Sequence, residues 1–194
     1  MDLRGFTNII VGLVFIFFNF TINGFDIIPD FIGYLFIFAG LISVSKYCRT
    51  FSSAAAFAFL LLIMSAFSSF MSALYGLGSI SYPLTEGVPS IVLWPISLVG
   101  LAFSVGLHLL LGKGMIDMLN RYELSVAAGG TANCIIVNIV VLLLTGILTF
   151  PPFLPLTFLL PLTIPLIIVG LFAKLWLMVR IGRNKKLLEA SAII

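Results

Sequence analysis

Fifty consecutive residues, from 124 to 173, contain no Asp, Glu, Lys, Arg or His. A run of this length predicts segments that are buried in lipid, because about 20 apolar residues already suffice for one transmembrane helix. Over the whole chain, charged residues make up 9%, against roughly 25% in a typical soluble domain. This composition excludes a soluble enzyme, a nucleic-acid-binding domain and a disordered chain.

The remaining charge-free runs predict an all-α, polytopic membrane protein with a single membrane domain over residues 1–194. We expect six transmembrane helices, and the run 124–173 is long enough for two of them. Between the fourth and the fifth, residues 113–125 have amphipathic spacing, which favours an interfacial helix on the membrane surface. Gly129 and Gly130 are expected to break the chain after it. The expected transmembrane helices are 6–23, 29–48, 54–75, 89–111, 132–150 and 158–181.

The basic residues predict the orientation. The expected loops near 24–28, 76–88 and 151–157 contain no Lys or Arg, so all ten basic residues fall on the other side. The positive-inside rule then places both termini in the cytoplasm. Cys48 and Cys134 are expected near this face, as reduced thiols.

Two carboxylates near the start of the second expected helix are the best candidates for chemistry. Asp26 and Asp30 stand four residues apart, with Pro29 between them. One interpretation is an acidic N-terminal cap at the outer surface, stabilised by the helix dipole. The other is a cation or proton site at an external mouth, with Asn19 and Asn23 continuing a polar lining, since acids inside a membrane tend to be functional.

Other polar residues inside the helices have simpler explanations. Asn138 and Thr145 are expected to form interhelical hydrogen bonds. His108 is a candidate secondary polar site, either in a proton relay or as a hydrogen-bonded packing residue. Lys174 is expected to extend toward the inner interface, as long basic side chains do near helix ends.

The residues around the acidic pair also resemble a known group. The run Asp26-Ile27-Ile28-Pro29-Asp30-Phe31-Ile32-Gly33-Tyr34, after a first apolar helix, is similar to a D-x-x-P-D-F-x-G-Y signature. The signature occurs in small uncharacterised bacterial membrane proteins of Gram-positive type. The resemblance covers about residues 4–45. It implies a location in the plasma membrane and carries no activity with it.

The chain lacks the usual catalytic motifs. It contains no HExxH, no G-x-S-x-G and no GxxxxGK[ST] sequence, and we expect no enzyme activity, cofactor or metal. The leading hypothesis is a small protein of transport or channel type, surrounded by the lipid bilayer and acting as a homo-oligomer. The alternative is a non-catalytic accessory or assembly subunit of a larger membrane complex. A membrane enzyme acting on lipids is a third hypothesis, and no nucleic acid partner is expected.

Overall fold

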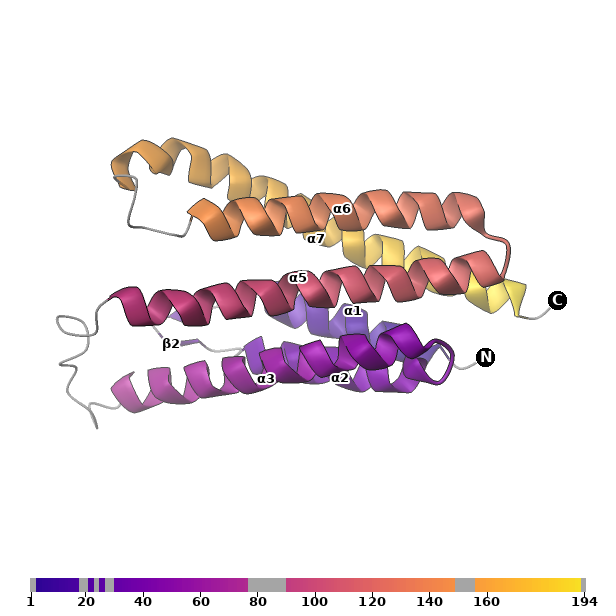
Figure 1. The fold of residues 1–194 in the computed structure, drawn as a ribbon, viewed down its shortest axis with the longest axis horizontal. Coiled ribbons are helices and arrows are strands. Elements are labelled where there is room, and N and C mark those ends of the chain that lie inside the picture. The colour runs from indigo at the N-terminus through magenta and orange to yellow at the C-terminus, as the bar shows by residue number, and fades with distance from the viewer. Residues whose placement is uncertain are drawn as a thin grey trace.

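A computed structural model describes residues 3–17, 21–22, 25–26, 30–76, 90–148 and 156–192. The helices run side by side along the long axis of the molecule, and both ends of the chain lie at the same end of the bundle (Figure 1). We call this end, where the turns 46–48 and 122–124 also lie, the terminal end. The elements are α1 (Arg4–Phe17), β1 (Thr21–Ile22), β2 (Phe25–Asp26), α2 (Asp30–Ser45), α3 (Arg49–Gly76), α5 (Ser90–Arg121), α6 (Ser125–Leu148) and α7 (Leu156–Ser191).

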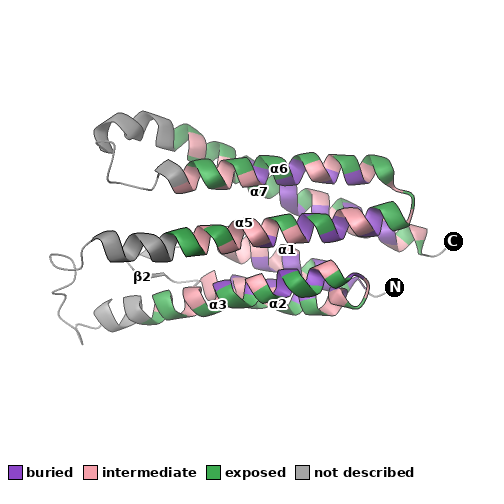
Figure 2. Ribbon diagram, viewed as in Figure 1, coloured by how far each residue is buried: buried purple, intermediate pink, exposed green. Residues whose placement is uncertain are grey.

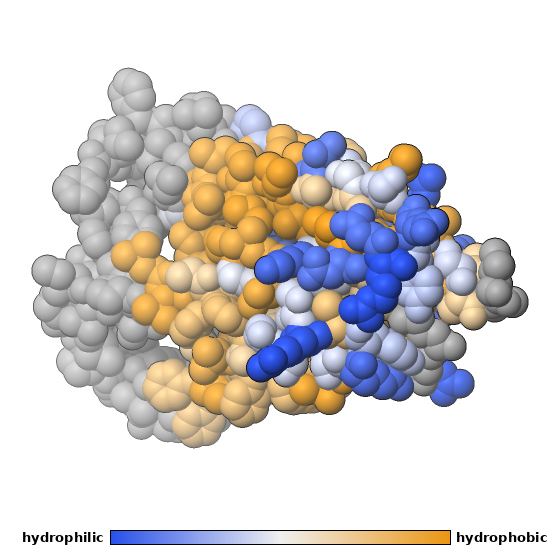
Figure 3. Space-filling model, turned by 45° about the vertical axis from the view of Figure 1, so that its right-hand side comes forward, coloured by the Kyte–Doolittle hydropathy of each residue, from blue (hydrophilic) through white to orange (hydrophobic). Residues whose placement is uncertain are grey.

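The protein is an all-helical membrane protein apart from the two short strands, which pair antiparallel. Among the described residues, four helical segments are long and apolar enough to cross a membrane, while α1 and α2 are shorter apolar helices. Apolar side chains cover much of the described surface, and polar ones gather toward the terminal end (Figure 3). The four long segments are Arg49–Phe70, Leu98–Arg121, Ser125–Gly146 and Ile164–Ser191.

The six helices form a closed ring. Each helix packs against its neighbours in the chain, and α7 returns to pack against α1, whereas α5 and α7 barely touch. The buried residues are concentrated in the half of the bundle nearer the terminal end (Figure 2). There, Phe6 of α1 and Phe51 of α3 meet edge to face, with ring centroids 5.7 Å apart. Within the described part of the bundle, packing is therefore tightest at the terminal end, and the cavity described below lies further from that end.

The structure differs from the expected interfacial helix at residues 113–125. α5 continues through Arg121 without a break, and Met115, Met118 and Leu119 are buried in the core. The helix ends in a Schellman motif, in which the amide of Leu124 donates to the carbonyl of Leu119 and Glu123 has a φ of 59°. The amphipathic pattern is the same for a helix that faces protein as for one that faces lipid headgroups.

The last two helices also extend beyond their expected bounds. α6 begins at Ser125 and includes Gly129 and Gly130, which were expected to lie in a break. A side chain at Gly130 would overlap the guanidinium of Arg180, so a glycine here gives room to α7. α7 continues to Ser191 because its last turns still bury Ile181, Leu188 and the amide of Asn184.

The hairpin of α1 and α2 is shorter than expected. α2 has 16 residues, about 24 Å of helix, which is less than a hydrocarbon core of about 30 Å. It starts at Asp30 and reaches the terminal end at Ser45. Asp30 therefore lies well inside the length of the bundle, since α3 and α5 extend further away from the terminal end (Figure 1).

Candidate functional site

The candidate site is a cluster of polar side chains at mid-height in the bundle. Asp30 is the first residue of α2, and its carboxylate oxygen Oδ1 is buried. Lys174 lies in the middle of α7, 17 residues before its end at Ser191. Ser104 likewise lies 17 residues before the end of α5 at Arg121, which is about 26 Å along the helix. Helix geometry thus places these residues of three helices at similar depth.

Electrostatic contacts join these residues. The charge of Asp30 acts on the ammonium group of Lys174 and on the hydroxyl of Tyr34, one turn further along α2. Tyr34 and Ser104 share a side-chain hydrogen bond between α2 and α5. An acid and a base that meet inside a membrane lower the cost of each other's charge. Lys174 therefore does not act only as a basic residue that reaches for the interface.

His108 connects α5 to the same cluster. Its Nδ1 lies 2.8 Å from the carbonyl oxygen of Ser104, one turn earlier. Because a carbonyl oxygen only accepts, Nδ1 carries the proton in this bond. This leaves Nε2 available to other groups. The charge of Lys174 also acts on the His108 ring, so the imidazole and the ammonium belong to one electrostatic unit.

Asn138 fixes the position of α7 next to Lys174. Its Nδ2 donates to the carbonyl of Cys134 in its own helix and to that of Ala173 in α7, both at 2.9 Å. Ala173 directly precedes Lys174, and Asn138 is buried. This bond confirms the expected interhelical role of Asn138. The described bond of Thr145 runs within α6, to the carbonyl of Val141 at 2.8 Å.

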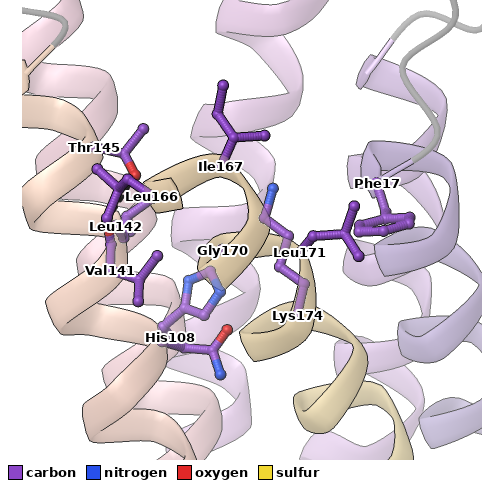
Figure 4. A pocket seen from close by; sticks show the side chains of 11 residues that line it. Phe17, His108, Val141, Leu142, Thr145, Leu166, Ile167, Gly170, Leu171 and Lys174 are labelled. Carbon is purple, nitrogen blue, oxygen red and sulfur yellow. Dashed lines mark hydrogen bonds between the residues drawn. The ribbon is translucent and has the colours of Figure 1, made fainter. Parts of the chain in front are cut away.

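A cavity of about 460 Å³ lies beside the cluster, between α1, α5, α6 and α7. Figure 4 shows Phe17 of α1 on one side of it and Val141, Leu142 and Thr145 of α6 on the other. Lys174 extends from α7 between these two walls. The cavity is lined by Phe17, His108, Asn138, Val141, Leu142, Thr145, Leu166, Ile167, Gly170, Leu171 and Lys174.

The structure brings only some of the residues singled out in the sequence together. Asp30 and His108 both belong to the cluster, on different helices, and Lys174 connects them electrostatically. Asp26 lies in β2, paired with Thr21, so it does not share a helical face with Asp30. Asn19 and Asn23 lie outside the described residues. Within the described part of the chain, no group of three His, Cys, Asp or Glu side chains could hold a metal ion.

No protein-family model, curated protein or solved structure matches this chain. The assignment of function therefore depends on the site itself.

Tyr34, Ser104 and Lys174 are the members of the cluster that sequence reasoning missed. Tyr34 stood in the signature around Asp30 but was given no role in a site, and Lys174 was expected as an interfacial residue. The available signal was an acid and a base that each lie inside an apolar segment, since such residues tend to pair. The structure also gives roles to three signature residues: the charge of Asp30 acts on Lys174, Tyr34 bonds to Ser104, and Gly33 packs closely against Gly12.

Proposed function

We propose that this chain is a small transport-type protein of the plasma membrane, in which Asp30 binds a proton or a cation in the interior of the bundle. It crosses the membrane six times, with both termini in the cytoplasm. The observation that carries the proposal is the buried carboxylate oxygen of Asp30, at a depth similar to that of Lys174 inside a ring of apolar helices, together with the action of its charge on Lys174.

The energetic cost of these charges supports a functional role. A single Asp or Lys at the centre of a transmembrane helix costs about 2.5–3.5 kcal/mol on insertion scales. Two well-packed apolar residues would avoid this cost, so a chain that retains both charges at one depth is expected to use them. Binding of a proton or cation to Asp30 would change the partner of Lys174, and such exchange is what a transport cycle requires.

The distribution of charge supports the orientation. Both ends of the chain and the turns 46–48 and 122–124 lie at the terminal end, where the polar surface gathers. The basic residues Lys46, Arg121 and Arg183 belong to this end or its adjoining turns. By the positive-inside rule the terminal end is cytoplasmic.

Proton flux into liposomes tests the proposal. The purified chain is reconstituted with a pH-sensitive dye inside, and a potassium diffusion potential drives the flux. We expect the wild type to exceed empty liposomes and Asp30→Asn to fall to the level of empty liposomes. Asp117→Asn is the matched control, because Asp117 lies near the terminal end of α5 and accepts a hydrogen bond from Thr50 at 3.3 Å.

Two outcomes would overturn the proposal. One is an Asp30→Asn variant that folds and conducts as the wild type does. The other is a wild type that never exceeds empty liposomes with protons, sodium or potassium. In the second case, copurification of a stoichiometric membrane protein would favour the accessory-subunit hypothesis.

A further inference from the structure

The cavity beside the cluster has the charge pattern of an anion site. Among the described residues, those that line it include Lys174 with its ammonium group and no Asp or Glu. His108 adds an imidazole whose Nδ1 is already engaged with Ser104. An anion in the cavity would therefore meet the ammonium group of Lys174 and no acidic side chain among the described lining residues.

The remaining walls are suited to a hydrocarbon chain. Leu142, Leu166, Ile167 and Leu171 line the cavity with aliphatic side chains. Its volume of about 460 Å³ is within the range of about 300–1,000 Å³ that small-molecule sites occupy. A site with one cationic end and aliphatic walls fits a ligand that is itself charged at one end and apolar at the other.

The cavity borders the lipid-facing surface. Ile167 is 63% exposed and Leu171 is 40% exposed, although both also line the cavity. In a membrane these side chains face acyl chains, so a ligand already dissolved in the bilayer can reach the cavity laterally. A strictly water-soluble anion would first have to cross an apolar surface.

We propose that this cavity binds a medium-chain carboxylate from the bilayer, with its carboxylate at Lys174 and its alkyl chain along α6 and α7. Asn138 keeps Lys174 in place by its bond to Ala173. Gly170 lines the cavity without a side chain, and a Cβ at this position would be in van der Waals contact with Val141 at 3.4 Å.

Lys174 then connects the carboxylate site to the proton site, and this part of the inference rests on the proposed function. Asp30 is the acidic residue whose charge acts on Lys174. When Asp30 is neutral, Lys174 lacks this partner and attracts an external carboxylate more strongly, so the two binding events favour each other. The other polar groups around these residues within the described structure are Tyr34 from α2, Ser104 and His108 from α5, and Asn138 and Thr145 from α6.

Equilibrium binding of radiolabelled octanoate tests the inference. The full-length chain is placed in lipid nanodiscs, and empty nanodiscs give the background. We expect saturable binding of one octanoate per chain. Lys174→Met should weaken it about tenfold or more, whereas Lys174→Arg should retain it. Lys113→Met is the matched control, because Lys113 is an exposed residue of α5 that lies closer to the terminal end than the cavity does.

Further variants and competitors separate the contributions of charge and shape. Gly170→Leu should abolish binding by filling the cavity without changing its charge. Asp30→Asn should bind octanoate more tightly than the wild type. Octanol, which lacks the charge, and acetate, which lacks the chain, should each compete poorly. If acetate competes as well as octanoate, the site serves a water-soluble anion and the proposed lipid source is wrong.

The inference fails if Lys174→Met binds octanoate as the wild type does, or if octanol competes equally with octanoate. The octanoate-binding assay tests the inference separately from the flux assay. Loss of octanoate binding with intact Asp30-dependent flux would remove the inference alone, whereas octanoate binding without flux would remove only the proposed function.

Discussion

Gly5 of α1 and Gly40 of α2 bring the backbones of the two helices into direct contact. A Cβ atom added to either residue would lie 2.5 Å from the carbonyl oxygen of the other. Seven residues after Gly5 and seven residues before Gly40, Gly12 and Gly33 form a second contact of the same kind. Small residues permit such close approach of helices in membranes, where dispersion contacts replace the hydrophobic effect. The hairpin that carries Asp30 is thus held by four glycines.

Gly40→Ala is therefore predicted to destabilise the protein, although alanine favours helix. The added methyl group would meet the backbone oxygen of Gly5 and the backbone nitrogen of Ile9, neither of which can rotate away. We expect the free energy of unfolding to fall by about 1–3 kcal/mol, as for other overpacked sites. The SDS concentration at the midpoint of unfolding measures this change.

Gly129→Ala is the matched control for Gly40→Ala. Gly129 also lies in a helix, but a Cβ there would meet nothing within 4 Å. The free energy of unfolding of the Gly129→Ala variant should stay the same or rise by up to about 1 kcal/mol, because alanine is the better helix former. Equal midpoints for Gly40→Ala and the wild type would contradict the close packing of α1 and α2.

Only part of the helix arrangement could be predicted from the sequence. Charge-free runs located the apolar segments because the cost of burying charge in lipid is large. The end of α5 was missed because Met115 and Leu119 show the same spacing whether they face lipid headgroups or, as here, the protein core. Helix ends depend on such tertiary contacts, which sequence periodicity does not specify.

Part of the candidate site could also be predicted from the sequence. Asp30 and His108 stood out as ionisable residues in apolar surroundings. Lys174 was assigned to a helix end because the bounds of the last helix were drawn too short, at residue 181 instead of Ser191. The contact between α7 and α1 closes the ring and brings α7 against the helical hairpin that carries Asp30, and no local pattern reports that contact.

Neutralising one member of the Asp30–Lys174 pair should cost more stability than neutralising both. Asp30→Asn leaves Lys174 as an uncompensated charge in an apolar bundle. We expect this to lower the free energy of unfolding by about 3 kcal/mol. The double variant with Lys174→Met contains neither charge and should recover most of this loss. Thermal unfolding in detergent compares the three proteins. Additive losses in the double variant would show that the two charges do not interact.

The hydrogen bond between Asn184 and Thr131 should stabilise the contact of α6 with α7. Asn184 Nδ2 donates to Thr131 Oγ1 at 2.8 Å, and both residues are buried. A double-mutant cycle with Asn184→Ala and Thr131→Val should give a coupling energy of about 0.6 kcal/mol, the average for such bonds in membranes. A coupling of zero would mean that the two side chains do not depend on each other.

The depth of Asp30 and the orientation of the chain can be measured together by cysteine labelling. Native Cys48 and Cys134 are buried and are first replaced by alanine. With an impermeant maleimide on intact cells, Ser81→Cys in the predicted outer loop should react. Val126→Cys, which is 90% exposed at the start of α6, should react only after permeabilisation. Asp30→Cys should react slowly in both conditions, because the position lies inside the bundle. Rapid labelling of position 30 in intact cells would place it at the outer surface and favour the helix-cap interpretation, whereas labelling of position 126 in intact cells would invert the topology.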